Sequence, residues 1–401
     1  MKRNPLLVIL ALCLIVLSFF CYAEEVPVKK NKPIKAESLE QLVVLVVSAI
    51  ADNDIQRLKQ IITGNNRLIL ENKLLAIQWC STILDVAVEK ELAGQGKLGK
   101  NYFKIAGMVA EIYKNAANSS YLLDKVAIFQ KWNKEGKEKY QKAEKLYGRG
   151  EELRKKYRYD EAVDCYDKSL LLYREIGFKE GETNCLRSLG DIHRMLSEYE
   201  KARQSYEQGL EIYREIKSRK GEADCLLCLG EVHLMLSVYE KAHQQYEQGL
   251  EIYREIKSRQ GEAQCLLRLG EMHRMLSEYE KARQSYEQGL EIYREIKSRH
   301  GEANCLRSLG DVHIRLSEYE KARQRYEQGL EIFREIKDRR GEAECLRSLG
   351  DVHIRSSEYE KARQRYEQGM EIYREIKSHL GEATCLRSLG DGVLSASVRM
   401  A

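Results

Sequence analysis

GEANCLRSLGDVHIRLSEYEKARQRYEQGLEIFREIKDRR, residues 301–340, is followed over 341–380 by a second stretch that matches it at 33 of 40 positions. Gly-Glu-Ala or Gly-Glu-Thr recurs at 181, 221, 261, 301, 341 and 381, so the period is 40 residues. Such a period indicates stacked units, each too small to bury its apolar face alone. The sequence predicts five full repeats over 181–380, numbered 1 to 5 below. A degenerate copy precedes them at 141–180, and a partial copy follows at 381–401.

Each repeat carries two helical patterns, named helix A and helix B. In repeat 1, one face of helix A holds Thr183, Leu186, Gly190 and His193 at spacings of three or four. Helix B follows a Ser-x-x-Glu sequence, which predicts that Ser197 caps the helix and that Glu200 answers it. Gly221 is expected to end helix B, because glycine readily adopts the left-handed conformation that terminates helices.

Composition favours an all-α fold. The chain has only three prolines, at positions 5, 27 and 33, so nothing after Pro33 carries the strongest helix breaker. Residues 38–140 show apolar residues at helical spacing, and Ser38 with Gln41 forms a capping box at the start of this N-terminal helical region. Charged residues make up 32% of the chain but nearly cancel, with a formal net charge of +5. That balance argues against a nucleic-acid partner, which usually requires a concentrated basic surplus.

The first 23 residues read as an export signal. Lys2 and Arg3 precede a largely apolar run over 6–20, and Cys21-Tyr22-Ala23 places small residues before the expected cleavage site. We therefore expect a periplasmic or secreted protein, with a polar linker over 24–37. The alternative is that residues 6–23 stay uncleaved and anchor the chain in a membrane, which is the only membrane association expected.

Several positions of repeat 1 resemble the tetratricopeptide repeat family. They are Leu186, Leu189, Gly190, His193, Ala202, Tyr206 and Gly209. Leucine and histidine replace two family aromatics of helix A, and helix B extends beyond the usual 34-residue unit without its closing proline. Residues 141–391 thus look like the 40-residue repeats of spindle-orientation adaptors, with kinesin light chains a similar case. The resemblance implies a right-handed superhelical solenoid of helix-turn-helix repeats, which binds extended peptides on the concave surface lined by helix A.

Positions at which the copies differ are expected to form the binding surface. In the middle repeats they are apolar, with Leu227, Leu234, Met235, Leu267 and Met275, whereas later repeats offer Arg307, Arg315, Arg347 and Arg355. Arginine suits bidentate capture of carboxylates, so we expect a peptide with an apolar segment followed by an acidic one. The predicted peptide-binding residues are Asn184, Arg187, Asp191, Arg194, Leu227, Glu231, Leu234, Met235, Leu267, Glu271, Arg274, Met275, Arg307, Asp311, Arg315, Arg347, Asp351 and Arg355. The alternative is that Arg187 and Asp191, and similar pairs, form ordinary ion pairs on a solvent-exposed helix face and bind no ligand.

Residues that suggest chemistry have structural explanations. Five histidines, at 193, 233, 273, 313 and 353, stand at a core aromatic position of the resembled family, and each is expected to face its own hairpin rather than share a metal. The cysteines at 185, 225, 265, 305, 345 and 385 are expected to fill helix A as small apolar residues. We therefore predict no catalytic residue, no cofactor and no metal.

The predicted function is that of a non-catalytic scaffold for a protein or peptide partner. The alternative is the sensor portion of a larger or truncated signalling protein, such as one with a caspase-like peptidase domain, because the partial repeat breaks off into GVLSASVRMA. Self-association through the exposed end repeat is a third possibility, since a polar cap would be expected there.

Overall fold

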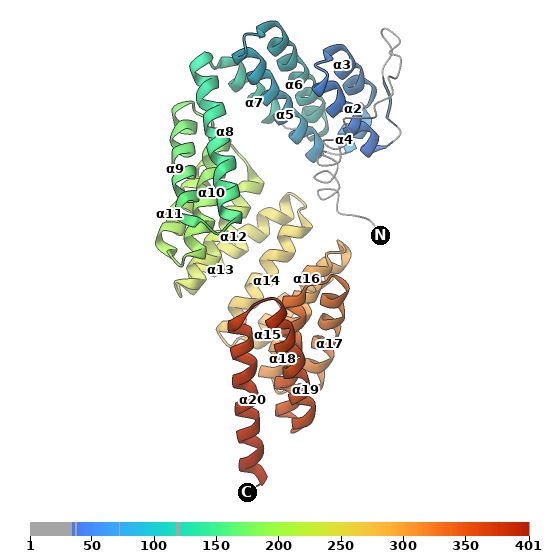
Figure 1. Ribbon diagram of the computed structural model, residues 1–401, viewed down its shortest axis with the longest axis vertical. Coiled ribbons are helices and arrows are strands. Elements are labelled where there is room, and N and C mark those ends of the chain that lie inside the picture. The colour runs from blue at the N-terminus through green and yellow to red at the C-terminus, as the bar shows by residue number, and fades with distance from the viewer. Residues whose placement is uncertain (1–33, 37, 72, 118–120, 401) are drawn as a thin grey trace. The chain divides into compact units, whose positions relative to one another are not determined.

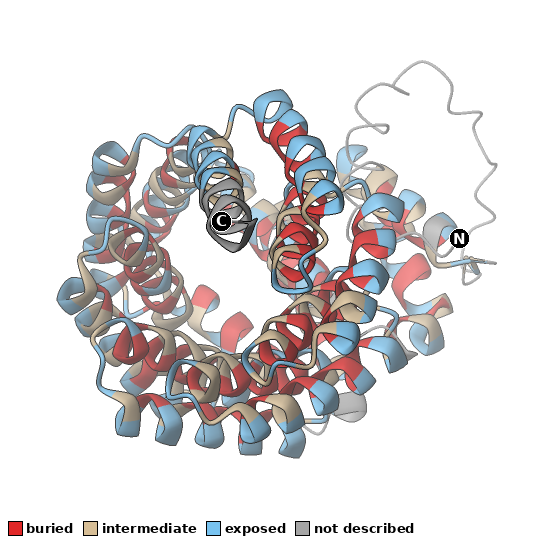
Figure 2. Ribbon diagram, turned by 90° about the horizontal axis from the view of Figure 1, so that it is seen from below, coloured by how far each residue is buried: buried red, intermediate tan, exposed pale blue. Residues whose placement is uncertain are grey.

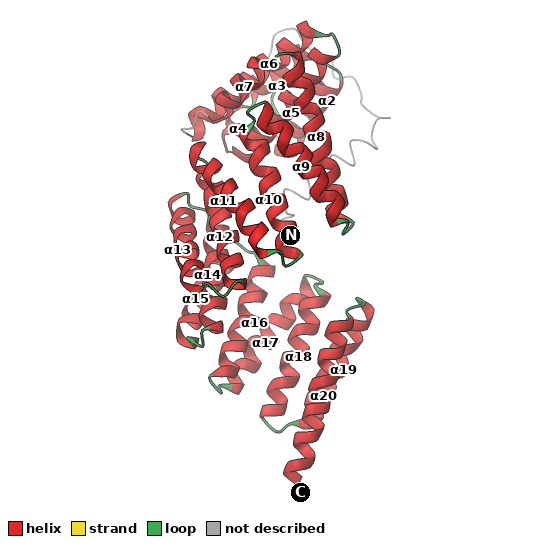
Figure 3. Cartoon of the chain, turned by 90° about the vertical axis from the view of Figure 1, so that its left-hand side faces the viewer, coloured by secondary structure: helices red, strands yellow, loops and turns green. Residues whose placement is uncertain are grey.

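The computed structural model describes residues 34–36, 38–71, 73–117 and 121–400. Within these ranges every regular element is a helix, and short loops join the helices (Figures 1 and 3). The predicted fold class, an all-α solenoid, is confirmed. None of the described helices has the length and apolar character needed to cross a bilayer. The predicted export signal over 1–23 lies outside the described residues, as does most of the predicted linker.

The chain divides into two compact bodies. The N-terminal body comprises residues 1–148 with 171–178, and the repeat body comprises 149–170 with 179–401. The helices that begin within the N-terminal body are α2 (Leu39–Ala51), α3 (Ile55–Gly64), α4 (Asn66–Glu71), α5 (Lys73–Leu92), α6 (Gly96–Ala117), α7 (Tyr121–Lys131) and α8 (Lys134–Lys155). Ser38 caps α2 as predicted, because its Oγ accepts from the backbone N–H of Gln41 at 3.2 Å.

The repeat body stacks helices of one length. Its helices are α9 (Tyr159–Glu175), α10 (Lys179–Met195), α11 (Tyr199–Glu215), α12 (Arg219–Met235), α13 (Tyr239–Glu255), α14 (Arg259–Met275), α15 (Tyr279–Glu295), α16 (Arg299–Arg315), α17 (Tyr319–Glu335), α18 (Arg339–Arg355), α19 (Tyr359–Glu375) and α20 (His379–Met400). From α10 to α19 each helix has 17 residues, and three residues join it to the next. Even-numbered helices from α10 onwards are helices A, and odd-numbered helices are helices B. Figure 2 shows buried residues in red where these helices face one another.

Tyrosine rings packed against glycines join the helices. Within repeat 3, a Cβ at Gly270 would lie only 2.5 Å from Cε1 of Tyr286, so the ring lies against bare backbone. Between repeats 1 and 2, a Cβ at Gly221 would lie 2.2 Å from Cδ1 of Tyr213. Gly221 therefore belongs to α12 and makes room for a neighbouring ring. The prediction that it ends helix B was wrong.

From α10 to α19 the helices end at residues in the left-handed conformation that are not glycine. Lys217, with φ of 55°, donates its N–H to the carbonyl of Arg214, and Ser218 donates to Tyr213. This pair of bonds is the Schellman arrangement, which satisfies the last carbonyls of a helix. Ser197, with φ of 61°, ends α10 in the same way. The predicted capping role of Ser197 was wrong, because α11 has Glu198 at its N-cap and no side-chain cap.

An ion-pair series runs along the junctions of successive repeats. Arg259 at the start of α14 contacts Glu262 at 2.5 Å and also pairs with Glu295 at the end of α15. Glu262 in turn accepts from Arg254 of the preceding repeat at 3.0 Å. The same set recurs with Arg219, Arg299 and Arg339. These ion pairs of exposed arginines connect successive repeats, and each pair contributes only modestly to the stability of the stack.

Alanine at two glycines of neighbouring helices should have opposite effects. Gly289→Ala should raise stability by up to about 1 kcal/mol, because alanine favours helix and the nearest atoms lie at 3.6 Å. Gly270→Ala gains the same helix propensity. It should nevertheless lower stability by about 1 to 3 kcal/mol, because the added Cβ would displace the ring of Tyr286. Urea denaturation of both variants checks this, and effects of the same sign would contradict the packing explanation.

Glycine at a helix terminus should stabilise the chain. Lys257 has φ of 56°, a conformation that costs a side-chain-bearing residue roughly 1 kcal/mol. Lys257→Gly should therefore raise the thermal midpoint slightly, after the entropy of the unfolded chain offsets part of the gain. Gln248→Gly, at an exposed position inside α13, is the matched control and should lower the midpoint. A loss of stability in Lys257→Gly would contradict the assignment.

Candidate functional site

The predicted stripe of helix A is accessible in the structure with one exception. Arg187, Met235, Met275, Arg315 and Arg355 are exposed. Asn184, Asp191, Arg194, Leu227, Glu231, Leu267, Glu271, Arg274, Arg307, Asp311, Arg347 and Asp351 are half-buried. Leu234 is only 4% exposed, so it packs in the core and is removed from the predicted apolar section.

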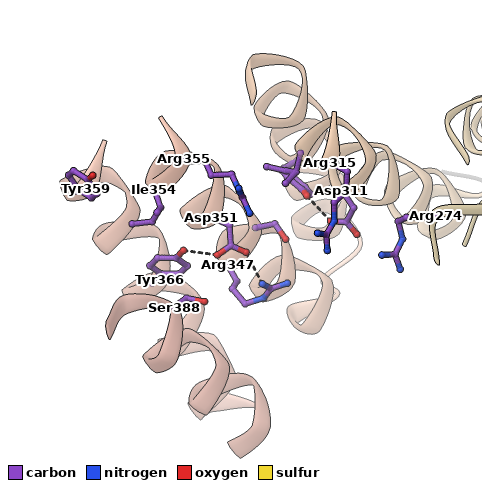
Figure 4. A pocket seen from close by; sticks show the side chains of 13 residues that line it. Arg274, Asp311, Arg315, Arg347, Asp351, Ile354, Arg355, Tyr359, Tyr366 and Ser388 are labelled. Carbon is purple, nitrogen blue, oxygen red and sulfur yellow. Dashed lines mark hydrogen bonds and ion pairs between the residues drawn. The ribbon is translucent and has the colours of Figure 1, made fainter. Parts of the chain in front are cut away.

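A cavity of about 610 Å³ lies on this stripe over repeats 3 to 5 and the partial repeat. It is lined by Arg274, Asp311, Ile314, Arg315, Tyr326, Arg347, Ser348, Asp351, Ile354, Arg355, Tyr359, Tyr366 and Ser388. Figure 4 shows side chains from consecutive helices A around it, together with Tyr359 and Tyr366 of α19. We call it the arginine pocket. The four arginines exceed the two aspartates by two positive charges, so the pocket favours an anion.

Tyrosines and an arginine hold the two aspartates in place. Asp311 accepts from the hydroxyl of Tyr326 at 2.6 Å, and Asp351 accepts from Tyr366 at the same distance (Figure 4). Arg347 also donates to Asp351 at 2.9 Å. Burial raises the pKa of Asp351, although Tyr366 and Arg347 favour the ionised form. The aspartates therefore act as internal acceptors that orient the pocket.

Three arginines of the pocket have no carboxylate of their own. Arg274, Arg315 and Arg355 make no ion pair with any residue that the structure describes. By contrast, Arg347 is paired inside the pocket. Arg307, predicted for the same cluster, does not line the pocket, and its Nε lies 3.6 Å from Glu344. The donors open to an incoming anion are therefore Arg274, Arg315 and Arg355.

Sequence comparison among the repeats missed several lining residues. Tyr326, Tyr359, Tyr366, Ser348 and Ser388 occupy positions that hardly vary between the last copies, so differences between copies cannot reveal them. The signal that could have found Tyr326 and Tyr366 is the spacing of 15 residues between each aspartate and its tyrosine, which recurs in both repeats.

The middle of the groove holds an ion-pair cluster that the sequence analysis did not anticipate. Arg268 stands where repeats 1, 4 and 5 have a serine. Its Nε lies 2.7 Å from Glu231, and its Nη1 lies 2.9 Å from Glu271. Arg194 approaches Glu231 at 3.5 Å. The section expected to offer apolar side chains therefore also contains paired charges beside Leu227 and Leu267.

The repeated histidines bind within their own hairpins. Nδ1 of His193, His273, His313 and His353 lies 2.6 to 2.7 Å from a glutamate five residues later. In repeat 2, Val238 replaces that glutamate and His233 contacts Gln245 at 2.7 Å instead. Over the described ranges, no cluster of three potential metal ligands occurs. Four of the histidines thus link the end of helix A to the residue that precedes helix B, and His233 contacts a residue within α13.

The repeated cysteines are buried thiols. Cys225, Cys265, Cys305 and Cys345 are at most 1% exposed, and burial raises the pKa of each thiol to about 12. Such thiols are mostly protonated at neutral pH and react slowly. Their place beneath the neighbouring helix agrees with the predicted filling role.

These observations define a helical-repeat protein whose helices A line a ligand-sized groove. The sequence model of the tetratricopeptide repeat family matches residues 141–215, 222–295, 262–335 and 301–375, which together exceed half of the chain. The chain belongs to the tetratricopeptide repeat family. No curated protein matches it in sequence.

Two solved structures share the fold. Aspartyl phosphate phosphatase F from Bacillus subtilis is 12% identical, covers 90% of this chain and 96% of its own, and has a TM-score of 0.53. A signal transduction ATPase with a tetratricopeptide repeat sensor from Pyrococcus horikoshii is 18% identical, covers 78% of this chain and 52% of its own, and has a TM-score of 0.51. At these identities the likeness concerns the fold. The chain is a repeat protein of the protein-interaction type, built on a fold that is generally non-catalytic.

The contact of His353 and Glu358 should be visible in the pH dependence of stability. Hydrogen bonds from Lys361 and then His353 lower the pKa of Glu358 to about 2 from 4.5. Because the folded-state pKa is depressed, the ionised carboxylate stabilises the fold above about pH 4.5, and this stabilisation is lost as the pH falls toward 2. Thermal midpoints of Glu358→Gln should therefore lie below those of the unmodified chain at pH 5 to 7 and converge with them near pH 2. A constant difference over that range would contradict the assignment.

Proposed function

We propose that the protein binds an acidic segment of a partner protein, held in extended or helical form along helices A of repeats 2 to 5. The observation that carries the proposal is the arginine pocket, in which Arg274, Arg315 and Arg355 converge without carboxylate partners of their own. Guanidinium groups in a partly enclosed cavity bind carboxylates through two parallel hydrogen bonds, so side chains of aspartate and glutamate fit them.

The size and lining of the pocket favour a peptide over a small anion. A volume of about 610 Å³ accommodates several residues of an extended chain. Ile314 and Ile354 give it apolar walls between the charges, while the hydroxyls of Ser348 and Ser388 can bond a backbone carbonyl. Exposed Met235 and Met275 extend the apolar lining toward the earlier repeats. The groove thus suits an apolar residue followed by acidic ones.

A sensor role in a larger signalling protein is the second candidate. It is supported by the shared fold with the repeat sensor of the Pyrococcus horikoshii ATPase. In that role the same groove would receive the signal, so the two candidates differ in what binding triggers rather than in what binds. The predicted export signal over 1–23 bears on this choice and stays a prediction.

Removal of two pocket arginines should weaken the binding of acidic peptides. Peptides selected from a random 12-residue display library against the full chain should be enriched in aspartate and glutamate. Arg315→Gln with Arg355→Gln should lower the affinity for a selected acidic peptide by roughly 10- to 100-fold, because two charge-assisted hydrogen-bonding groups are lost. Isothermal titration calorimetry measures this.

The matched control removes the same charge from another face of the same repeats. Arg325→Gln with Arg365→Gln changes two helix B arginines that lie outside the arginine pocket. This pair should leave the affinity within about twofold. The proposal is contradicted if selected peptides show no excess of acidic residues, or if both pairs of substitutions have equal effects.

A further inference from the structure

One groove position behaves differently in the middle repeats. In repeats 1, 4 and 5 it is Asp191, Asp311 or Asp351, and each accepts from the hydroxyl of its helix B tyrosine at 2.6 Å. In repeats 2 and 3 the position is glutamate instead. The corresponding hydroxyls, of Tyr246 and Tyr286, are buried and have no acceptor among the described residues. A tyrosine hydroxyl left unpaired in a protein interior is destabilising.

Arg268 explains why both tyrosines lack an acceptor. Glu231 and Glu271 turn toward its guanidinium, at 2.7 and 2.9 Å, rather than toward their own tyrosines. Repeats with a serine in place of Arg268 keep the bond between aspartate and tyrosine. The two glutamates therefore have two competing partners, Arg268 and the tyrosine of their own repeat.

Unpaired donors concentrate in this groove. In the described repeat body, four buried polar side-chain atoms lack a hydrogen-bond partner, and all four can donate. They belong to Arg194, Tyr246, Tyr286 and Arg307. A carboxylate from outside would supply the missing acceptor capacity.

The geometry points to Arg268 as a second carboxylate-binding position, distinct from the arginine pocket, at which an acidic residue of the bound segment replaces Glu231 and Glu271. The displaced glutamates then accept from the hydroxyls of Tyr246 and Tyr286, as the aspartates do in repeats 1, 4 and 5. Arg268 is open to this exchange, since 37% of its side chain is exposed. The inference rests on the proposed function, because it concerns the same bound segment.

The two sites share one helix, because Arg268 and Arg274 both lie on α14. The segment should therefore carry an acidic residue for Arg268 in addition to the acidic residues that occupy the arginine pocket.

The state of the free protein is tested by removing hydroxyls. Tyr246→Phe with Tyr286→Phe should leave the urea midpoint unchanged or raised, because these hydroxyls lack acceptors. Tyr326→Phe with Tyr366→Phe, the matched pair, should lower it, because both hydroxyls donate to aspartates. Equal losses in the two pairs would overturn the inference before any ligand is added.

The exchange is tested with the tightest acidic peptide from the display library. Arg268→Ser, which introduces the residue of repeats 1, 4 and 5, should lower the affinity for this peptide by about tenfold. Tyr246→Phe with Tyr286→Phe should weaken it by several fold, although neither ring is exposed to the peptide. A peptide with the corresponding aspartate changed to asparagine should bind the unmodified chain and Arg268→Ser equally.

The outcomes separate this inference from the proposed function. Unchanged affinity in Arg268→Ser, with weaker binding in Arg315→Gln with Arg355→Gln, overturns the second site and keeps the arginine pocket. Weaker binding in Arg268→Ser alone overturns the arginine pocket as the main acidic site. Failure to recover any acidic peptide overturns both.

Discussion

Every junction between successive helices from α10 to α20 depends on an aromatic ring that lies against a glycine. Tyr206 lies on Gly190 within repeat 1, and Tyr213 lies on Gly221 of the next repeat, so one kind of contact serves both the hairpin and the stack. A side chain at either glycine would occupy the space of the ring. Because the contact brings backbones close, it fixes the separation of helices A, and that separation determines where the groove residues stand.

The equal helix lengths follow from identical endings. From α10 to α19, each helix of 17 residues stops at a left-handed residue that is serine or lysine, and three residues join it to the next helix. Two such segments make the 40-residue period. Since serine follows helix A and lysine follows helix B, the two kinds of turn differ in sequence but share one hydrogen-bond pattern. Many amino-acid differences among the repeats lie on the accessible stripe of helix A. There they change the chemistry offered to a ligand without changing the packing of the helices.

The sequence was sufficient for the fold because the repeat displays the same constraints five times. It was insufficient where one residue type has two uses. Gly221 suits a helix end and also a close ring contact, and only the position of Tyr213 shows which applies. Ser197 suits a cap and also a left-handed terminus. At the site, Leu234 matched the stripe by spacing but is buried, whereas Arg268 lies beside the stripe and was not among the predicted residues.

The uniform three-residue turns also have a consequence for how such a chain can change over generations. Repeats 4 and 5 differ at only seven of 40 positions, so their coding segments are near-duplicates that can misalign during recombination. Loss or gain of one whole period would join turns of the same geometry, and the neighbours would meet a surface they already fit. The groove can therefore lengthen or shorten by complete modules, and each added module brings its own choice of arginine, leucine or glutamate to the recognised segment.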